Sequence, residues 1–373
     1  MKICFITGTR AEYGIIAPII RAVSAQSDTK TQIVATNMHL SPEYGLTVNE
    51  IEADGFTVDA KIEMLLSSDT PAGTVKSMGV EAIGLADALD HLRPDRIVIL
   101  GDRYEMLTAA SSALIFGIPI VHLHGGETTL GAYDNSIRHA ITQLASLHLT
   151  STEEYRQRII SMGKDPDTVY CIGSPAADSI SRFVPMSREE LADSIGWDLG
   201  ERYIVVTFHP VTLQPGDEER QTTALLQALD SLPSDVRVLF TLPNSDTGGR
   251  LVRQLIENHT GQRPDKMKAV CSLGAQRYLS AVAHSCGVVG NSSSGIIEAP
   301  SLHVPTLNIG DRQKGRARAD SVIDTDTSIE AITNGLRLIL DPNTQEVART
   351  VCNPYSHPGT IDRAAELILN HQS

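Results

Sequence analysis

Two short apolar runs on either side of a helical segment, between residues 96 and 123, constrain the fold of this chain most strongly. Residues 96–100 (RIVIL) and 118–123 (IPIVHL) have the length and the β-branched content of buried strands. Residues 104–116 have a helical pattern, and Gly117 suits the left-handed position after a helix C-terminus. A strand, a helix and a strand in this order form a right-handed parallel crossover, so both strands end at the same edge of a sheet.

Charged side chains directly follow these two strands. Asp102 and Arg103 follow the first, and His124 and Glu127 follow the second. Asp134 comes shortly afterwards and is expected to be the N-cap of a helix over residues 135–148. Ligands of open α/β sheets bind beyond the carboxyl ends of the strands. The sequence therefore predicts an active site rich in carboxylates at this edge.

The alternation of strand, turn and helix continues along all 373 residues, which is too long for one ordinary core. We expect two Rossmann-like domains, an N-terminal one over residues 1–180 and a C-terminal one over 181–356, with a last helix at 357–373 that packs back onto the first. In the first strand–helix turn Arg10 can meet a phosphate. A dinucleotide cofactor is not expected, because that turn lacks the GxGxxG spacing.

The second half offers its own candidates at strand ends. His209 follows the strand at 202–208, and a strand at 286–289 leads into the small residues Gly290–Gly295, which could cradle a phosphate at the following helix. Glu298, about one turn into that helix, could accept hydrogen bonds from ribose hydroxyls or simply stabilise the helix dipole. Residues 312–318 contain four cations, a local anion-binding cluster in an acidic chain.

Composition narrows the class of partners. The formal net charge of −14 argues against nucleic acid or an anionic membrane. The five cysteines are scattered without a CxxC pair, which fits reduced thiols in the cytoplasm better than disulfides or a zinc site. No apolar stretch approaches the ~20 residues of a membrane span, and the first apolar run is too short for a signal peptide. We expect a cytoplasmic protein.

Seven motifs in order carry a family resemblance: GTRAEYG, GDRYE, HLHGGETTLGAYDNSIRHAI, LHLTSTEEY, FHPVT, GNSSSGIIEAPS and NIGDRQKGR. The chain resembles, over nearly its whole length, the hydrolysing UDP-N-acetylglucosamine 2-epimerases of the bacterial sialic-acid pathway. The resemblance implies the GT-B architecture, with the active site in the cleft between two Rossmann-like domains. It implies catalytic roles for Asp102, Glu127 and Asp134, with His124 and His209 as further candidates. It implies that UDP is bound by Arg10, Arg103, His209, Asn244, Ser292, Ser293, Glu298 and Arg312.

One position departs from the family pattern. In mammalian relatives a catalytic glutamate precedes the Gly-Gly pair, where this chain has His124, and the spacing onward to Asp134 is one residue longer here. The acid/base role therefore falls to Glu127, to His124 or to both, with Glu127 the first choice.

The reaction that the resemblance implies is the conversion of UDP-N-acetylglucosamine and water to UDP and N-acetylmannosamine, by elimination to a 2-acetamidoglucal and then hydration. It needs no metal and no redox cofactor, and the family expectation is a homodimer or homotetramer. A close alternative is the same reaction on UDP-2,4-diacetamido-2,4,6-trideoxyglucose in legionaminic acid synthesis.

Three more distant alternatives remain. A GT-B glycosyltransferase would share the fold and the UDP site, but the carboxylates of the first domain disfavour it. A non-catalytic nucleotide-sugar sensor is disfavoured by the same carboxylates. The motifs GD and HxHGG are typical of metallophosphoesterases, and His122 and His124 are expected on one face of a strand, so a metal is not excluded; that class, however, also requires an early DxH and a GNH, which this chain lacks.

Overall fold

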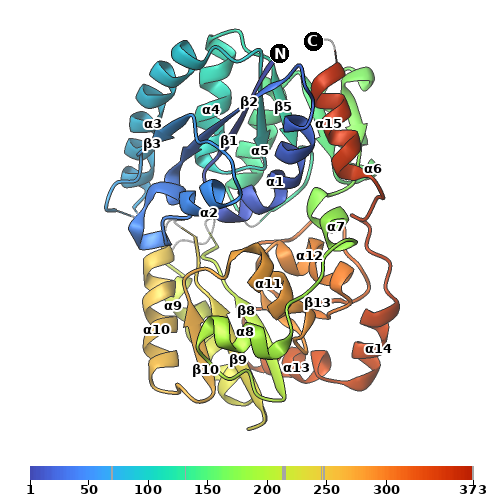
Figure 1. Cartoon of the computed structure of the whole chain (residues 1–373). Helices are drawn as coiled ribbons and strands as arrows, with labels where there is room; N and C mark the ends of the chain where they lie inside the picture. Colours follow the sequence, from blue (N-terminus) through green and yellow to red (C-terminus); the bar gives the residue numbers. More distant parts are fainter. Residues whose placement is uncertain (69, 131, 212–215, 245, 247, 372–373) are drawn as a thin grey trace. The chain divides into compact units, whose positions relative to one another are not determined.

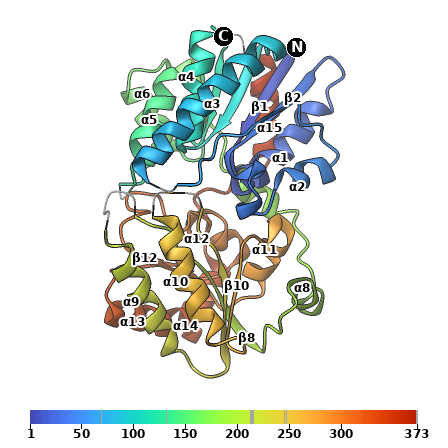
Figure 2. The same cartoon turned by 90° about the vertical axis from the view of Figure 1, so that its left-hand side faces the viewer.

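The computed structural model describes residues 1–68, 70–130, 132–211, 216–244, 246 and 248–371, which fall into two compact units (Figures 1 and 2). Unit 1 comprises Met1–Glu127, Tyr133–Ser179 and Tyr355–Ser373, and unit 2 comprises Thr128–Ala132 and Ile180–Pro354. Each unit is an α/β layer structure around a parallel sheet, as the sequence predicts. In the part of the chain that is described, no helix is long and apolar enough to cross a membrane.

Within the described residues, the sheet of unit 1 has seven parallel strands in the order β3-β2-β1-β4-β5-β6-β7. The strands are β1 Lys2–Thr7, β2 Lys30–Thr36, β3 Ala60–Ile62, β4 Arg96–Leu100, β5 Ile120–Leu123, β6 Leu147–Thr150 and β7 Val169–Cys171. The direction of strand addition reverses between β1 and β4. Such a reversal opens a crevice at the carboxyl ends of the strands, where open α/β sheets bind ligands.

Helices cover both faces of this sheet (Figure 1). They are α1 Arg10–Ser24, α2 Val48–Ala53, α3 Pro71–Leu92, α4 Tyr104–Ile115, α5 Asp134–Leu144, α6 Glu153–Ser161 and α15 Thr360–Asn370, and α7 Pro175–Ile180 spans the boundary to unit 2. Strand residues alternate between two cores: Val98 of β4 faces the core that contains α1, while Ile99 faces the core that contains α3 and α4.

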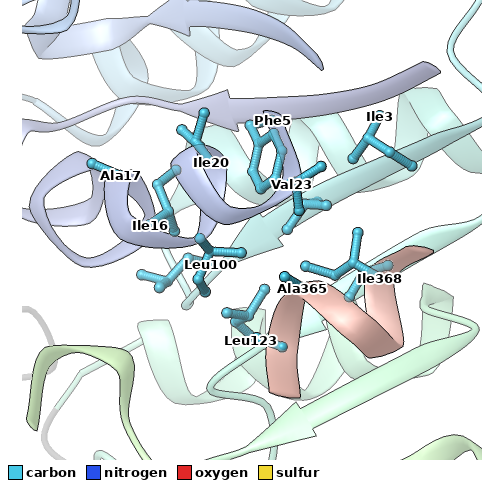
Figure 3. Close-up of a cluster of buried hydrophobic side chains, with 14 of the residues drawn as sticks. Ile3, Phe5, Ile16, Ala17, Ile20, Val23, Leu100, Leu123, Ala365 and Ile368 are labelled. Carbon is cyan, nitrogen blue, oxygen red and sulfur yellow. The ribbon is translucent and has the colours of Figure 1, made fainter. Parts of the chain in front are cut away.

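The last helix belongs to the first core. Figure 3 shows Ala365 and Ile368 of α15 in the same apolar cluster as Phe5 of β1 and Ile16 of α1. The buried guanidinium of Arg96 donates hydrogen bonds to the backbone oxygens of Ile368 and His371, which fixes the end of α15 against the start of β4.

Unit 2 repeats this plan with six described strands in the order β10-β9-β8-β11-β12-β13. The strands are β8 Arg202–Thr207, β9 Val236–Thr241, β10 Met267–Val270, β11 Val288–Gly290, β12 Thr306–Ile309 and β13 Val322–Thr325. The helices are α8 Arg188–Ile195, α9 Glu218–Asp230, α10 Gly249–Gly261, α11 Gly274–Ala283, α12 Ser294–Ile297, α13 Ile329–Ile339 and α14 Pro342–Thr350. Here the order reverses between β8 and β11.

Candidate active site

Four adjacent strands of unit 1, β1, β4, β5 and β6, end at one edge of the sheet, and each is followed by a polar segment. Arg10 follows β1, Asp102 and Arg103 follow β4, His124 follows β5, and Ser151 follows β6. The parallel registers bring these strand ends side by side, so the residues that follow them lie along one edge of the sheet.

A buried arginine links two of the candidate acids. The side chain of Arg138, on α5, is 1% exposed and forms an ion pair with the Asp102 carboxylate. Its Nη1 also donates a hydrogen bond of 2.9 Å to the backbone oxygen of Glu127. Arg138 therefore holds the segment after β4 and the segment after β5 in one arrangement.

Glu127 is fully buried, and two side chains contact the same carboxylate oxygen. His124 Nδ1 lies 3.0 Å from Glu127 Oε1, and Ser151 Oγ donates to Oε1 at 2.7 Å. His124 itself has a backbone φ of +62°, a left-handed conformation that is uncommon for residues other than glycine. Strained positions of this kind concentrate at functional sites.

The Gly-Gly pair explains how this loop packs so tightly. Gly126 has φ +76°, and a Cβ there would lie 2.6 Å from the backbone oxygen of Tyr155 on α6. Arg158 Nη1 donates to the backbone oxygen of Gly126 at 2.6 Å. The loop between His124 and Glu127 therefore lies directly against α6, at a distance that only glycine permits.

The arginine that follows β4 has a buried partner. Arg103 Nε donates to Glu105 Oε1 at 2.7 Å, and Glu105 is 0% exposed. A Cβ at Gly8 would lie 2.5 Å from the same oxygen, so the glycine after β1 leaves room for this ion pair. Arg10 Nε lies 3.7 Å from Glu50 Oε2, and the Arg10 side chain is mostly buried.

Two further buried carboxyls lie near Glu105. Burial and, to a smaller extent, the nearby Glu105 charge raise the pKa of Glu12 to about 8, although Glu12 Oε2 accepts hydrogen bonds from the backbone N–H groups of Gly8 and Thr9. Burial likewise raises the pKa of Glu81 well above its ordinary value, again with Glu105 adding to the effect. Within this buried group, Glu105 forms the ion pair with Arg103.

Asp134 is not the N-cap that the sequence predicts. The cap is Tyr133, and Asp134 is the first residue of α5, which ends at Leu144 and not near residue 148. Asp134 is buried in the first turn of α5, where a carboxylate is stabilised by the helix dipole.

The carboxyl edge of unit 2 is organised by Asn291, which sequence reasoning did not single out. Asn291 is fully buried, and its side chain bonds both the backbone N–H of His209 (2.7 Å) and the backbone oxygen of His209 (2.8 Å). The backbone N–H of Asn244 donates to His209 Nδ1 at 3.4 Å. Because Nδ1 accepts, the ring proton lies on Nε2, which makes His209 a hydrogen-bond donor toward an anion.

The cationic segment after β12 joins the same group. Arg312 Nη1 and Gln313 Nε2 both donate to the backbone oxygen of Asn291, at 3.2 and 2.9 Å, and Arg312 Nη2 lies 3.9 Å from Asp246. Two other cations of this segment have acidic neighbours: Lys314 pairs with Asp311 and Arg318 with Asp324.

The helix expected after Ser292 is shorter than predicted. It is the single turn α12, with Ser293 as its N-cap, and Glu298 is its C-cap and not a residue one turn inside it. A 3-10 turn at Ala299–Leu302 follows at once, because Pro300 cannot continue the α-helix ladder. Gly290 before it has φ +132°, and a Cβ there would overlap the backbone oxygen of Thr207.

His122 and His124 do not share a strand face, contrary to the prediction. His122 lies inside β5, where Nε2 contacts the backbone oxygen of Gly101 (2.8 Å) and Nδ1 contacts Thr142 Oγ1 (3.3 Å), while His124 lies beyond the strand end. Burial lowers the pKa of His122 to about 4, so the ring is neutral at pH 7. Among the described residues, no group of three or more His, Cys, Asp or Glu side chains has a geometry that could hold a metal ion.

Known proteins match this chain over most of its length. The sequence model of the family described as UDP-N-acetylglucosamine 2-epimerase matches residues 21–369. The chain is similar to a GDP/UDP-N,N'-diacetylbacillosamine 2-epimerase (hydrolyzing) of Campylobacter jejuni, with 40% identity over 87% of this chain and 84% of that protein. It is 36% identical to a UDP-N,N'-diacetylbacillosamine 2-epimerase (hydrolyzing) of Legionella pneumophila, over 98% and 95% of the two chains. A UDP-N-acetylglucosamine 2-epimerase of Neisseria meningitidis is 29% identical over 100% of this chain and 96% of its own length.

Solved structures show the same fold. The Methanocaldococcus jannaschii UDP-GlcNAc 2-epimerase in complex with UDP-GlcNAc and UDP superposes with a TM-score of 0.82 at 18% identity, covering 99% of both chains. The N. meningitidis UDP-GlcNAc 2-epimerase bound to UDP-GlcNAc superposes with a TM-score of 0.81 at 17% identity, covering 100% of both. The chain belongs to the UDP-N-acetylglucosamine 2-epimerase family and, within it, to the hydrolysing 2-epimerases of UDP-sugars.

Proposed function

We propose that this protein acts on UDP-N,N'-diacetylbacillosamine, that is, UDP-2,4-diacetamido-2,4,6-trideoxyglucose, and releases UDP and the free 2,4-diacetamido-2,4,6-trideoxymannose. The supporting observation is that two relatives named for diacetylbacillosamine have higher sequence identity to this chain than a relative named for UDP-N-acetylglucosamine. Those named for diacetylbacillosamine are 40% and 36% identical to this chain, whereas the N. meningitidis relative named for UDP-N-acetylglucosamine is 29% identical.

The chemistry begins with loss of the diphosphate. The hydrogen on C2 has no adjacent carbonyl, so it becomes acidic only as the C1–O bond breaks and positive charge develops at C1. Preorganised positive groups that stabilise the departing diphosphate are commonly the largest catalytic contribution. Each unit has positive groups at the carboxyl edge of its own sheet that suit this role: Arg10 and Arg103 in unit 1, and Arg312 and the His209 ring in unit 2.

The remaining UDP contacts in this proposal come from unit 2. Ser292 and Ser293 are partly exposed at the start of α12, where hydroxyls and backbone N–H groups can bind phosphate oxygens. Asn244 and Glu298 supply an amide and a carboxylate for the uracil and ribose hydroxyls.

Proton transfer then completes two steps. A base takes the C2 proton, and the C–H electron pair forms the C1=C2 double bond of a glycal as UDP leaves. Water then adds its oxygen to C1, while an acid returns a proton to C2 from the opposite face. Asp102, His124, Glu127 and Asp134 are the candidate acid/base groups, and two groups of different basicity suit two opposite faces.

The second candidate substrate is UDP-N-acetylglucosamine, which the family description and the full-length N. meningitidis relative favour. The test is kcat/KM for both UDP-sugars under identical conditions, with UDP release as the rate and NMR to identify the sugar. The proposal expects diacetylbacillosamine to be preferred by at least about 100-fold, a reasonable value for a site that binds the 4-acetamido group with hydrogen bonds. Equal or better turnover of UDP-N-acetylglucosamine would overturn the choice of substrate but not the reaction.

A further inference from the structure

His124 and Glu127 form a hydrogen-bonded pair beyond the carboxyl end of β5. Glu127 is 0% exposed, and Oε1 contacts both His124 Nδ1 at 3.0 Å and Ser151 Oγ at 2.7 Å. His124 Nε2 is buried and has no hydrogen-bond partner within the described part of the chain. A buried polar atom in this state usually awaits a ligand or a water molecule.

The backbone holds the imidazole in one orientation. His124 adopts φ +62°, and its N–H donates to the backbone oxygen of Leu149 at 3.0 Å. Arg158 and Arg138 bond the backbone oxygens of Gly126 and Glu127. This strained position is therefore fixed on both sides, as expected where a side chain must point in one direction.

We propose that Nε2 of His124 takes the proton from C2 of the sugar, and that Glu127 and Ser151 are positioning residues that hold the imidazole for this step. The inference rests on the proposed function and changes the expected order of the two residues. When Nδ1–H donates to Glu127, Nε2 carries the lone pair. It accepts the C2 proton, the C–H electrons form C1=C2, and UDP leaves with the C1–O electron pair.

The surrounding charges support this assignment. The Glu127 carboxylate stabilises the imidazolium that forms, as the carboxylate of a hydrolase triad does. Asp102, the other candidate base, is already engaged in an ion pair with Arg138. His122 lies in β5, two residues before His124. Burial lowers its pKa to about 4, so its ring stays neutral above about pH 5 and does not compete for the proton.

The first test is the pH dependence of kcat for His124→Gln, Glu127→Gln and Ser151→Ala on whichever UDP-sugar the wild type turns over. A matched control is Ser146→Ala, because Ser146 lies before β6, as Ser151 lies after it, and Ser146 Oγ donates to the Ile120 oxygen at 3.2 Å.

We expect His124→Gln to lower kcat about 10²–10⁴-fold and to abolish the fall of kcat at low pH. Glu127→Gln should keep this fall but shift it to lower pH, because the imidazolium loses its counter-charge. Ser151→Ala should lower kcat several-fold with KM unchanged, and Ser146→Ala should match the wild type.

The outcomes separate this inference from the proposed function. A wild type that turns over neither UDP-sugar overturns both. An active wild type in which Glu127→Gln is inert while His124→Gln keeps more than about a tenth of the activity overturns the inference alone. An independent readout is ¹⁵N NMR of histidine-labelled protein without substrate, with His124 assigned from the His124→Gln spectrum. The expected tautomer has Nδ1–H; a tautomer with the proton on Nε2 would contradict the inference.

Discussion

Arg138 and Asp102 form an ion pair at the carboxyl edge of the unit 1 sheet, and the same guanidinium bonds the backbone of Glu127. The arginine thus couples the segments that follow two strands. The Arg138 side chain is 1% exposed and the Asp102 side chain 21% exposed, so the guanidinium is buried while the carboxylate keeps some access to solvent; a fork-shaped guanidinium suits such a carboxylate partner.

We predict that Arg138→Lys will lower kcat by about 100-fold, because a displacement of about 1 Å in a catalytic group costs this much. Lysine keeps the charge but cannot bond Asp102 and the Glu127 oxygen at the same time. Steady-state kinetics would check this, with Arg156→Lys as the control, because Arg156 is a partly buried arginine of α6 that donates to the Val169 oxygen at 2.8 Å. Equal activity in both variants would show that the Arg138 contacts do not position the site.

The tight packing of the Gly-Gly loop predicts a difference between two glycines that both have positive φ. Gly163→Ala meets no atom within 4 Å and should cost about 1–2 kcal/mol for the left-handed backbone alone. Gly126→Ala adds the clash with the Tyr155 oxygen and should cost about 1–3 kcal/mol more. The free energies of unfolding in urea measure both, and equal losses would mean that the loop relaxes away from α6.

Asn291 should matter for binding as well as for stability. Asn291→Ala leaves the buried N–H and C=O groups of His209 without this partner, at about 1–3 kcal/mol for each group. The matched control is Asn353→Ala, because Asn353 is also a buried amide of unit 2 and donates to the Ile297 oxygen at 2.8 Å. Both should lower the melting temperature, but only Asn291→Ala should weaken UDP binding in calorimetry. The same UDP affinity in both variants would remove Asn291 from the site.

The buried carboxyl of Glu12 predicts a pH effect on stability. Its pKa is about 8 in the folded protein and ordinary in the unfolded chain, so between these values the folded state holds a proton that the unfolded state has lost. Its contribution therefore makes stability fall as pH rises from about 4.5 to 8. Glu12→Gln should flatten this decline in melting temperatures measured from pH 5 to 8. If the melting temperature of Glu12→Gln falls with pH as steeply as that of the wild type, the role of Glu12 is contradicted.

The strands and their ends could be predicted because each buried strand is a short apolar run bounded by polar or glycine residues, as at residues 96–103. The side-chain contacts could not. Ser151 bonds Glu127 across 24 residues, and Asn291 bonds His209 across 82, so both depend on strand register that no local pattern contains. The sequence offered one indication that Ser151 and Asn291 belong to a site: each follows the carboxyl end of a buried strand.

The most direct test of the central claim is proton NMR of the reaction in heavy water with UDP-N,N'-diacetylbacillosamine. The account predicts UDP and free 2,4-diacetamido-2,4,6-trideoxymannose with deuterium at C2, since the C2 proton is lost in elimination and a solvent deuteron returns during hydration. A product that keeps protium at C2, or a UDP-sugar that is epimerised but remains intact, would contradict it.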